Sequence, residues 1–234
     1  MLLLSASLAL AGERAFGFTY GYGTVPKGGI EIEQYSTVSM DDGGKRNEWE
    51  HQVELEYGIT DRLESGLYFV GGQTNAGPFA YRGFKARLRY RFGSEGVGPI
   101  DPAVYLEYIS EPTFQEHGVE GKVILAKMVG KLELAFNAEY TITVAPNSLT
   151  HEIEPLLGIG YHVAPWFCVG VESKNEVEIV DGEVEGPRAW AGPAVHLAGE
   201  GGRFWVTVSG LAPLTDETAE DHGVFVRTLL AVNL

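Results

Sequence analysis

The sequence predicts an all-β fold, a single antiparallel transmembrane β-barrel of about twelve strands, and three observations lead to this prediction. Short stretches alternate strictly between polar and apolar residues, the links between them alternate in length, and aromatic residues gather at both ends of the apolar faces. In FKARLRYRF, for example, Lys85, Arg87, Arg89 and Arg91 share one face, and five apolar residues share the other. This period of two is the signature of a strand with one polar and one apolar face.

The strand candidates run from turn signal to turn signal along the chain. In EWEHQVELEY every second residue is Glu or Gln, and in KLELAFNAEYTI apolar residues alternate with smaller or polar ones. Gly and aromatic residues at such short spacing favour an all-β fold. The candidates are residues 29–38, 48–57, 63–71, 81–92, 102–110, 118–128, 131–142, 150–161, 166–174, 188–197, 203–211 and 223–234.

The links between these candidates alternate between short and long. GITDR, the Val129-Gly130 pair, HVAP and AGEGG are short, with GSEGVGPID as the long exception on this side. The other links are longer and polar: MDDGGKRN, GGQTNAGPFA, SEPTFQEH, VAPNSL, NEVEIVDGEVEG and APLTDETAEDH. Bacterial outer-membrane barrels have this asymmetry, with short periplasmic turns and longer extracellular loops.

The first residues predict export and divide the chain into three parts. An apolar run ends in Ala9-Leu10-Ala11, which predicts a signal peptide over residues 1–11. We expect residues 12–28 to form an N-terminal periplasmic segment and residues 29–234 to form the barrel. No later segment approaches the roughly 20 apolar residues of a transmembrane helix. The single Cys168 allows no internal disulfide.

Composition argues against one class of partner. The formal net charge is −15, with 32 acidic residues against 17 Lys and Arg. Nonspecific binding to nucleic acid requires clustered cations on an exposed face, so no nucleic-acid partner is expected. A soluble β-sandwich or a lipocalin-like barrel explains the alternation equally well. Neither soluble fold explains the predicted signal peptide, the loop asymmetry and the aromatic residues together.

Aromatic residues on the apolar faces predict two belts that flank an aliphatic band, as at the two interfaces of a membrane. One set lies next to the short links and comprises Tyr57, Tyr90, Tyr161, Phe167 and Phe204. The other set lies toward the long links and comprises Trp49, Phe84, Tyr108 and Tyr140. His51 and Pro155 sit awkwardly on the apolar faces.

With the apolar faces outward, the polar faces line the lumen. The cations there are Lys85, Arg87, Arg89, Arg91, Lys122 and Arg227. The carboxylates are Glu31, Glu33, Glu50, Glu54, Glu56, Glu107, Glu120, Glu133, Glu139, Glu152, Glu154 and Glu172. The strand between the Glu ladder of residues 48–57 and the cation ladder of residues 84–92 offers Gly66 near its centre, and the ladders are expected to lie about 10 Å apart and to lean together over it. They either pair as structural salt bridges or stay hydrated and impose a transverse field on a narrow pore.

Catalytic and metal motifs are weak. Asn147, Ser148 and His151 form the best nucleophilic cluster, but they lie mainly in an expected loop with no visible oxyanion partner, and we interpret them as solvated. Nothing in the spacing of His117, His222 and Asp221 indicates a protease. The six His are dispersed and Cys168 has no CxxC partner, so no metal site and no cofactor are predicted.

The chain resembles a family of small bacterial outer-membrane barrels that includes channels of the "MetA pathway of phenol degradation" type. The residues that carry the resemblance are TVPKGGIEIEQY (24–35), LEYGITDRLESGLYF (55–69), DPAVYLEY (101–108) and GPAVHL (192–197). The resemblance implies passive transport and brings no established catalytic residues.

The sequence therefore favours a narrow passive channel for small polar or charged solutes in the outer membrane of a Gram-negative bacterium. The expected partners are these solutes, outer-membrane lipid and lipopolysaccharide, and the outer-membrane assembly machinery. The alternatives are a closed structural or surface-binding barrel and, with less support, an outer-membrane hydrolase.

Overall fold

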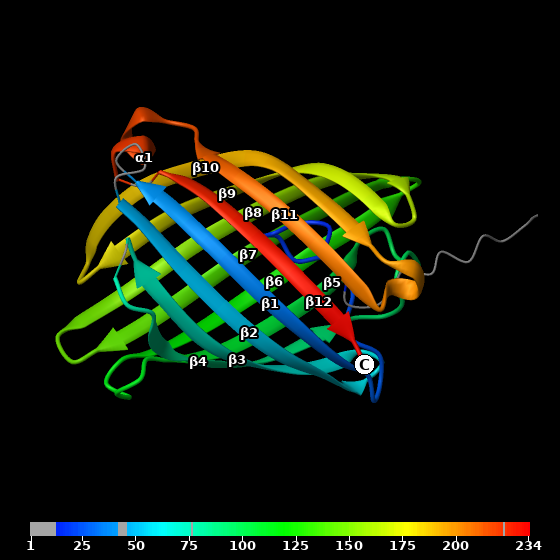
Figure 1. Cartoon of the computed structure of the whole chain (residues 1–234), viewed down its shortest axis with the longest axis horizontal. Coiled ribbons are helices and arrows are strands. Elements are labelled where there is room, and N and C mark those ends of the chain that lie inside the picture. The colour runs from blue at the N-terminus through cyan, green and yellow to red at the C-terminus, as the bar shows by residue number, and fades with distance from the viewer. Residues whose placement is uncertain (1–12, 42–45, 76, 222) are drawn as a thin grey trace, which may run out of the picture.

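Twelve antiparallel strands close into one barrel in the computed structural model, which describes residues 13–41, 46–75, 77–221 and 223–234 (Figure 1). Each strand pairs with its neighbours in the sequence, and β1 closes the barrel on β12 through a register that includes Glu33↔Ala231. The predicted fold class is confirmed. The strands are β1 (Ile30–Asp41), β2 (Arg46–Thr60), β3 (Leu63–Thr74), β4 (Ala80–Arg91), β5 (Asp101–Ser110), β6 (His117–Val129), β7 (Leu132–Ala145), β8 (Ser148–Ala164), β9 (Phe167–Val180), β10 (Glu183–Ala198), β11 (Phe204–Pro213) and β12 (Val224–Asn233).

Two short helical elements lie in the links. The 3-10 turn η2 (Glu200–Gly202) joins β10 to β11, and α1 (Asp216–Asp221) joins β11 to β12 at the opposite end of the barrel (Figure 1). No helix among the described residues is long and apolar enough to cross a membrane.

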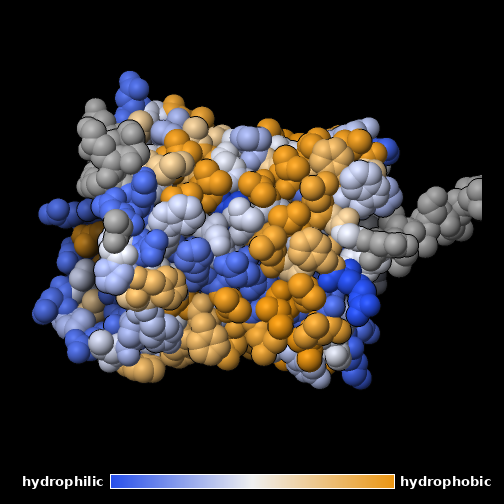
Figure 2. Space-filling view, in the orientation of Figure 1, coloured by the Kyte–Doolittle hydropathy of each residue, from blue (hydrophilic) through white to orange (hydrophobic). Residues whose placement is uncertain are grey.

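The two faces of the wall differ as the alternation predicts. On the inner face Glu54, Arg87 and Glu107 are buried, whereas on the outer face Leu55 and Leu106 are 50% and 57% exposed. Figure 2 shows hydrophobic side chains over much of the outer wall and hydrophilic side chains gathered at the end that carries α1. The wall is therefore polar inside and apolar outside, the reverse of a soluble barrel.

We call the end with the links after β2, β6 and β8 the turn end, and the opposite end the loop end. Two expected long loops are absent at the loop end. The strands β7 and β8 continue to a turn at residues 146–147, and β9 and β10 continue to Asp181-Gly182. Asp181 and Gly182 have φ of 52° and 90°, as a two-residue hairpin turn requires. The stretches VAPNSL and NEVEIVDGEVEG, which the sequence predicts to be loops, are thus mostly strands. Their β-branched residues extend the strand pairing beyond the loop-end aromatic belt.

The N-terminal segment lies inside the barrel. Phe16, Phe18, Tyr20, Tyr22 and Val25 are all buried, and together with inner-wall residues they form much of the hydrophobic core. We call residues 13–25 the N-terminal plug. The sequence predicts a periplasmic segment over residues 12–28, whereas residues 13–25 lie in the lumen, where their alternating aromatic rings are removed from water. The predicted signal peptide, residues 1–11, lies outside the described residues.

Candidate functional site: the lumen

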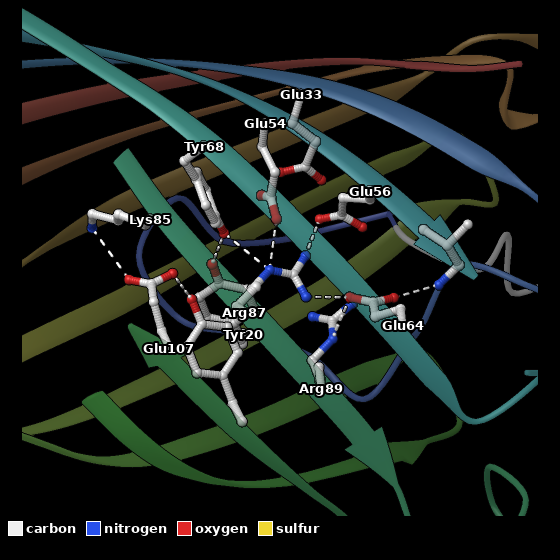
Figure 3. Close-up of polar contacts among 12 residues, drawn as sticks. Tyr20, Glu33, Glu54, Glu56, Glu64, Tyr68, Lys85, Arg87, Arg89 and Glu107 are labelled. Carbon is white, nitrogen blue, oxygen red and sulfur yellow. Dashed lines mark hydrogen bonds and ion pairs between the residues drawn. The ribbon is translucent and has the colours of Figure 1, made fainter. Parts of the chain in front are cut away.

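Arg87 is the centre of an ion-pair network in the turn-end half of the lumen (Figure 3). Its Nε lies 2.6 Å from Glu54 Oε1, and its Nη1 lies 2.6 Å from Glu64 Oε1. Its Nη2 pairs with Glu56, and Arg89 Nε reaches Glu64 Oε1 at 2.9 Å. All five side chains are almost fully removed from solvent. The ion pairs offset the cost of this burial, because an uncompensated buried charge is costly.

Gly66 allows this network to form. It lies on β3 between Glu56 on β2 and Arg87 on β4, and it is paired with both. A Cβ at this position would lie 2.1 Å from Glu54 Oε1 and 2.8 Å from Arg87 Nε. The expectation that the Glu and cation ladders lean together over Gly66 is confirmed.

Tyrosines extend the network toward β1 and the plug. The Tyr35 hydroxyl is hydrogen-bonded to Glu33 and lies 2.9 Å from Glu54 Oε2. Arg14 of the plug donates to the same hydroxyl at 3.0 Å, and its guanidinium lies 3.8 Å from the centroid of the Tyr20 ring. The plug is therefore joined electrostatically to the β1–β4 wall.

Three inner-wall side chains hold the backbone of the plug. The Glu172 carboxylate accepts hydrogen bonds from the amides of Gly17, Phe18 and Thr19 at 2.9–3.0 Å. Asn137 accepts from Tyr20 N at 2.6 Å and donates to Tyr20 O at 3.0 Å, in the manner of a neighbouring strand. Glu64 Oε2 accepts from Val25 N at 2.6 Å. These contacts satisfy backbone groups that lack a strand partner.

Glycines on β8 and β9 make room for the plug on the opposite wall. A Cβ at Gly158 would lie 2.7 Å from Phe16 Cε2, and a Cβ at Gly170 would lie 3.1 Å from Phe16 Cε1. The Phe16 ring therefore occupies space that side chains on an ordinary strand would fill.

The loop-end half of the lumen contains a polar cavity of about 360 Å³. Phe18 and Tyr20 of the plug line it, and its lining extends to Ser39 and Glu48 near the loop end. The Glu48 side chain is 48% exposed, so this end of the cavity meets solvent. The charged side chains in the lining are Glu48, Glu50, Lys85, Glu107, Glu120, Lys122, Glu139, Glu154, Lys174 and Arg227.

Most of these charges are paired across strands. Lys122 Nζ lies 2.7 Å from Glu139 Oε1, and Lys85 Nζ lies 3.4 Å from Glu107 Oε1. Lys174 pairs with Glu154. Arg227 differs, since its Nε donates to the Thr37 hydroxyl at 2.8 Å and its guanidinium lies 4.1 Å from the centroid of the Phe18 ring. The cavity thus presents both signs of charge to water.

The predicted lumen residues fall into two groups by burial. Buried are Arg87, Arg89, Lys122, Glu31, Glu33, Glu54, Glu56, Glu107 and Glu172. Partly exposed are Lys85, Arg91, Arg227, Glu50, Glu120, Glu133, Glu139, Glu152 and Glu154. Arg91 lies at the turn end, where it donates to Asp61 O.

The predicted aromatic belts lie on the outer face. Among their members Trp49, Tyr57, Tyr90, Tyr108, Tyr140, Tyr161 and Phe204 are exposed, and Phe84 and Phe167 are partly exposed. Histidines accompany the loop-end set, because His117 Nδ1 lies 2.6 Å from the Tyr108 hydroxyl and His151 Nδ1 lies 2.6 Å from the Tyr140 hydroxyl. His51 stacks on Trp49.

The interpretation of the weak catalytic cluster as a solvated loop is wrong for Ser148 and His151, which lie on β8. His151 faces outward on β8 and bonds Tyr140, and Ser148 is the residue at which β8 begins. His222 lies outside the described residues.

Sequence reasoning missed Glu64, Tyr68 and Asn137, as well as the plug itself. The alternation on β3 that placed Gly66 inside also places Glu64 and Tyr68 there, and Asn137 follows Glu133 on the inner face of β7. The pattern that could have identified them was therefore present. For the plug, the only available signal was the spacing of Phe16, Phe18, Tyr20 and Tyr22.

Comparison with solved structures finds barrels of similar architecture at low identity. The COG4313 outer membrane channel from Pseudomonas putida F1 is 10% identical with a TM-score of 0.67, covering 95% of this chain and 100% of that one. The NanC porin is 7% identical with a TM-score of 0.56, covering 88% and 100%. Omp33 of Acinetobacter baumannii, an outer membrane protein, is 7% identical with a TM-score of 0.50, covering 94% and 100%. At these identities the likeness concerns the fold, which resembles that of bacterial outer-membrane proteins.

Comparison with curated protein sequences finds no match. One family description matches residues 8–128, a little over half of the chain, and it is a family of unknown function. The assignment to the MetA-pathway type stays a prediction. The chain belongs to the family of unknown function DUF6662.

Proposed function

We propose that this chain is an outer-membrane β-barrel that acts as a narrow passive channel for small polar or charged solutes. The observation that carries the proposal is the cavity of about 360 Å³ in the loop-end half, lined by charges of both signs. Its volume lies in the range of small-molecule sites. Hydrogen bonds and packing hold the plug on the turn-end side of this cavity. If the plug were displaced, a path along the lumen would open.

The charges in the cavity indicate how solutes would be selected. Lys85 and Arg227 would attract anionic groups, and the more numerous carboxylates would attract cations. Opposite charges on facing walls of a narrow lumen impose a transverse field on a passing solute. The network of Arg87 and Arg89, by contrast, is buried and would act structurally.

The proposed location in the outer membrane is based on the outer face of the barrel wall. An apolar outer face with aromatic side chains toward both ends would contact lipid and lipopolysaccharide. The printed descriptions of two similar structures name a channel and a porin, which agrees with a transport role for this fold.

One observation favours a closed structural barrel as the second candidate. The plug and the Arg87 network occupy the turn-end half, and the core residues Tyr105, Ile124 and Ala135 pack there with Phe16 and Tyr20. If the plug is permanent, the lumen conducts nothing.

Planar-bilayer recordings of the folded protein separate the two candidates. The channel proposal expects small unitary conductance in the wild type and reduced anion preference in Lys85→Glu. Lys131→Glu is the matched control, because it makes the same charge change at a turn-end link outside the cavity. Heat-modifiable gel mobility verifies folding. Absence of any ion-permeable state in folded wild type would overturn the channel and support the closed barrel.

A further inference from the structure

Three different metal-binding side chains meet at the turn end of the lumen. The donor atoms of Glu133, His162 and Cys168, on β7, β8 and β9, all lie within 4.8 Å of one another. His162 and Cys168 face each other across the short link between β8 and β9, and the pairing of β7 with β8 brings Glu133 to them. His162 is paired directly with Cys168, and Glu133 is paired with Gly160, two residues before His162.

The distances suit a small cation after slight adjustment. His162 Nε2 lies 2.7 Å from Glu133 Oε2. Ligands about 2.0–2.3 Å from a tetrahedral Zn²⁺ are themselves about 3.3–3.8 Å apart. A small outward movement of the imidazole and the carboxylate would therefore admit the ion between them and the thiol.

Two glycines allow these side chains to come together. Gly160 lies between the three positions, and a Cβ there would be 2.9 Å from Cys168 Sγ. On the plug, a Cβ at Gly21 would be 3.3 Å from Glu133 Oε1. The absence of a side chain at these two positions thus lets the Cys168 thiol and the Glu133 carboxylate pack closely against β8 and the plug.

Burial also distinguishes this cluster from a surface ion pair. Cys168 is 1% exposed and forms no disulfide, and its thiol makes a long contact of 3.8 Å to Val169 O. The side chains of His162 and Glu133 are 27% and 17% exposed, so an ion can reach them from the turn end. The pair of His162 and Glu133 alone does not account for the buried thiol, whose sulfur lies within 4.8 Å of both donor atoms.

We propose that Glu133, His162 and Cys168 form a binding site for a divalent transition-metal ion of the Zn²⁺ class, with a fourth position open to water. Thiolate, imidazole and carboxylate together match the preferences of Zn²⁺. The thiol proton is released to solvent when the ion binds, so affinity rises with pH.

Cobalt spectroscopy on the full folded chain in detergent tests the site. Titration of the metal-free protein with Co²⁺ is expected to give intense visible bands and a thiolate-to-cobalt charge-transfer band, and Zn²⁺ is expected to abolish both. Cys168→Ser should lose the charge-transfer band, and His162→Gln should weaken Co²⁺ binding by more than about tenfold. His151→Gln, on the outer face, should change neither.

The outcomes are decisive and independent of conductance. No charge-transfer band in folded wild type overturns the site. A band that survives in Cys168→Ser overturns it too, as does Co²⁺ binding without a band, because the ion then sits on carboxylates alone. If Cys168→Ser does not fold, His162→Gln and Gly160→Ala, which crowds the thiol, supply the same comparison.

Discussion

The two halves of the lumen are built from the same alternating strands, yet the turn-end half is filled and the loop-end half holds a cavity. In the turn-end half, Arg87 is surrounded by three carboxylates and the plug takes up the remaining space. In the loop-end half, Lys85 lies two residues along the same strand, and its side chain faces the cavity. A charged inner face is therefore not by itself a sign of a hydrated pore. An inner face is filled where its charges pair across a glycine and the N-terminal plug covers the pairs, and it stays hydrated where these features are missing.

The largest expected difference is between Arg87 and Lys85. Arg87→Met should lower the free energy of unfolding by about 3–5 kcal/mol, because Glu54, Glu56 and Glu64 lose a buried partner. Lys85→Met, the matched control, should cost clearly less, since Lys85 is partly exposed, its pair with Glu107 is longer, and Glu107 keeps the hydrogen bond from the Tyr105 hydroxyl. Urea unfolding in lipid vesicles measures both. Equal losses would contradict the division of the lumen into a filled and a hydrated half.

A smaller effect is expected from the glycine under the network. Gly66→Ala should cost about 1–3 kcal/mol, because the added methyl group displaces Glu54 and Arg87 from each other. Gly121→Ala is the control, since nothing lies within 4 Å of its added Cβ. The same unfolding assay applies. A tolerated Gly66→Ala would show that the network adjusts without loss.

The attachment of the plug to the barrel wall can be tested at one side-chain amide, that of Asn137. Asn137→Ala removes both hydrogen bonds to Tyr20 and should loosen the plug by about 1–3 kcal/mol. Hydrogen exchange at residues 16–22 should accelerate. Asn175→Ala is the control, because it removes one hydrogen bond to Pro155 O on the outer face of the wall. It should leave the exchange at residues 16–22 unchanged. If both variants behave alike, Asn137 does not anchor the plug.

The smallest effect concerns the β5–β6 loop, outside the lumen. The Thr113 hydroxyl and the amides of Thr113 and Gln115 donate to Glu111 and lower its pKa to about 2. A depressed pKa in the folded state contributes stability above the ordinary pKa of Glu, and that stability is lost as pH falls toward 2. Carboxyl NMR titration should find this low pKa in the wild type. Thr113→Val should raise it, and an unchanged pKa would show that the hydroxyl is not the cause.

The strands and their faces could be predicted because alternation is local. FKARLRYRF places Arg87 opposite the apolar face, the loop asymmetry and aromatic belts of the whole chain turn that face inward, and Gly66 follows from the neighbouring strand. The lumen's contents could not be predicted in the same way. The plug has no ladder of its own, and its partners Glu172 and Asn137 lie more than 100 residues away in the sequence. The meeting of Glu133, His162 and Cys168 depends on the register of three strands, which no single stretch of sequence specifies.

Single-channel conductance of the wild type and of a chain lacking residues 13–25, recorded under the same conditions, tests the central claim that the N-terminal plug fills the turn-end half and limits passage. Gel mobility verifies folding, and Glu172→Gln combined with Asn137→Ala replaces the deletion if the shortened chain does not fold. We expect a several-fold larger conductance once the plug is removed or loosened. Equal conductance in both chains would contradict the claim, because the path would then be independent of the segment that lies in it.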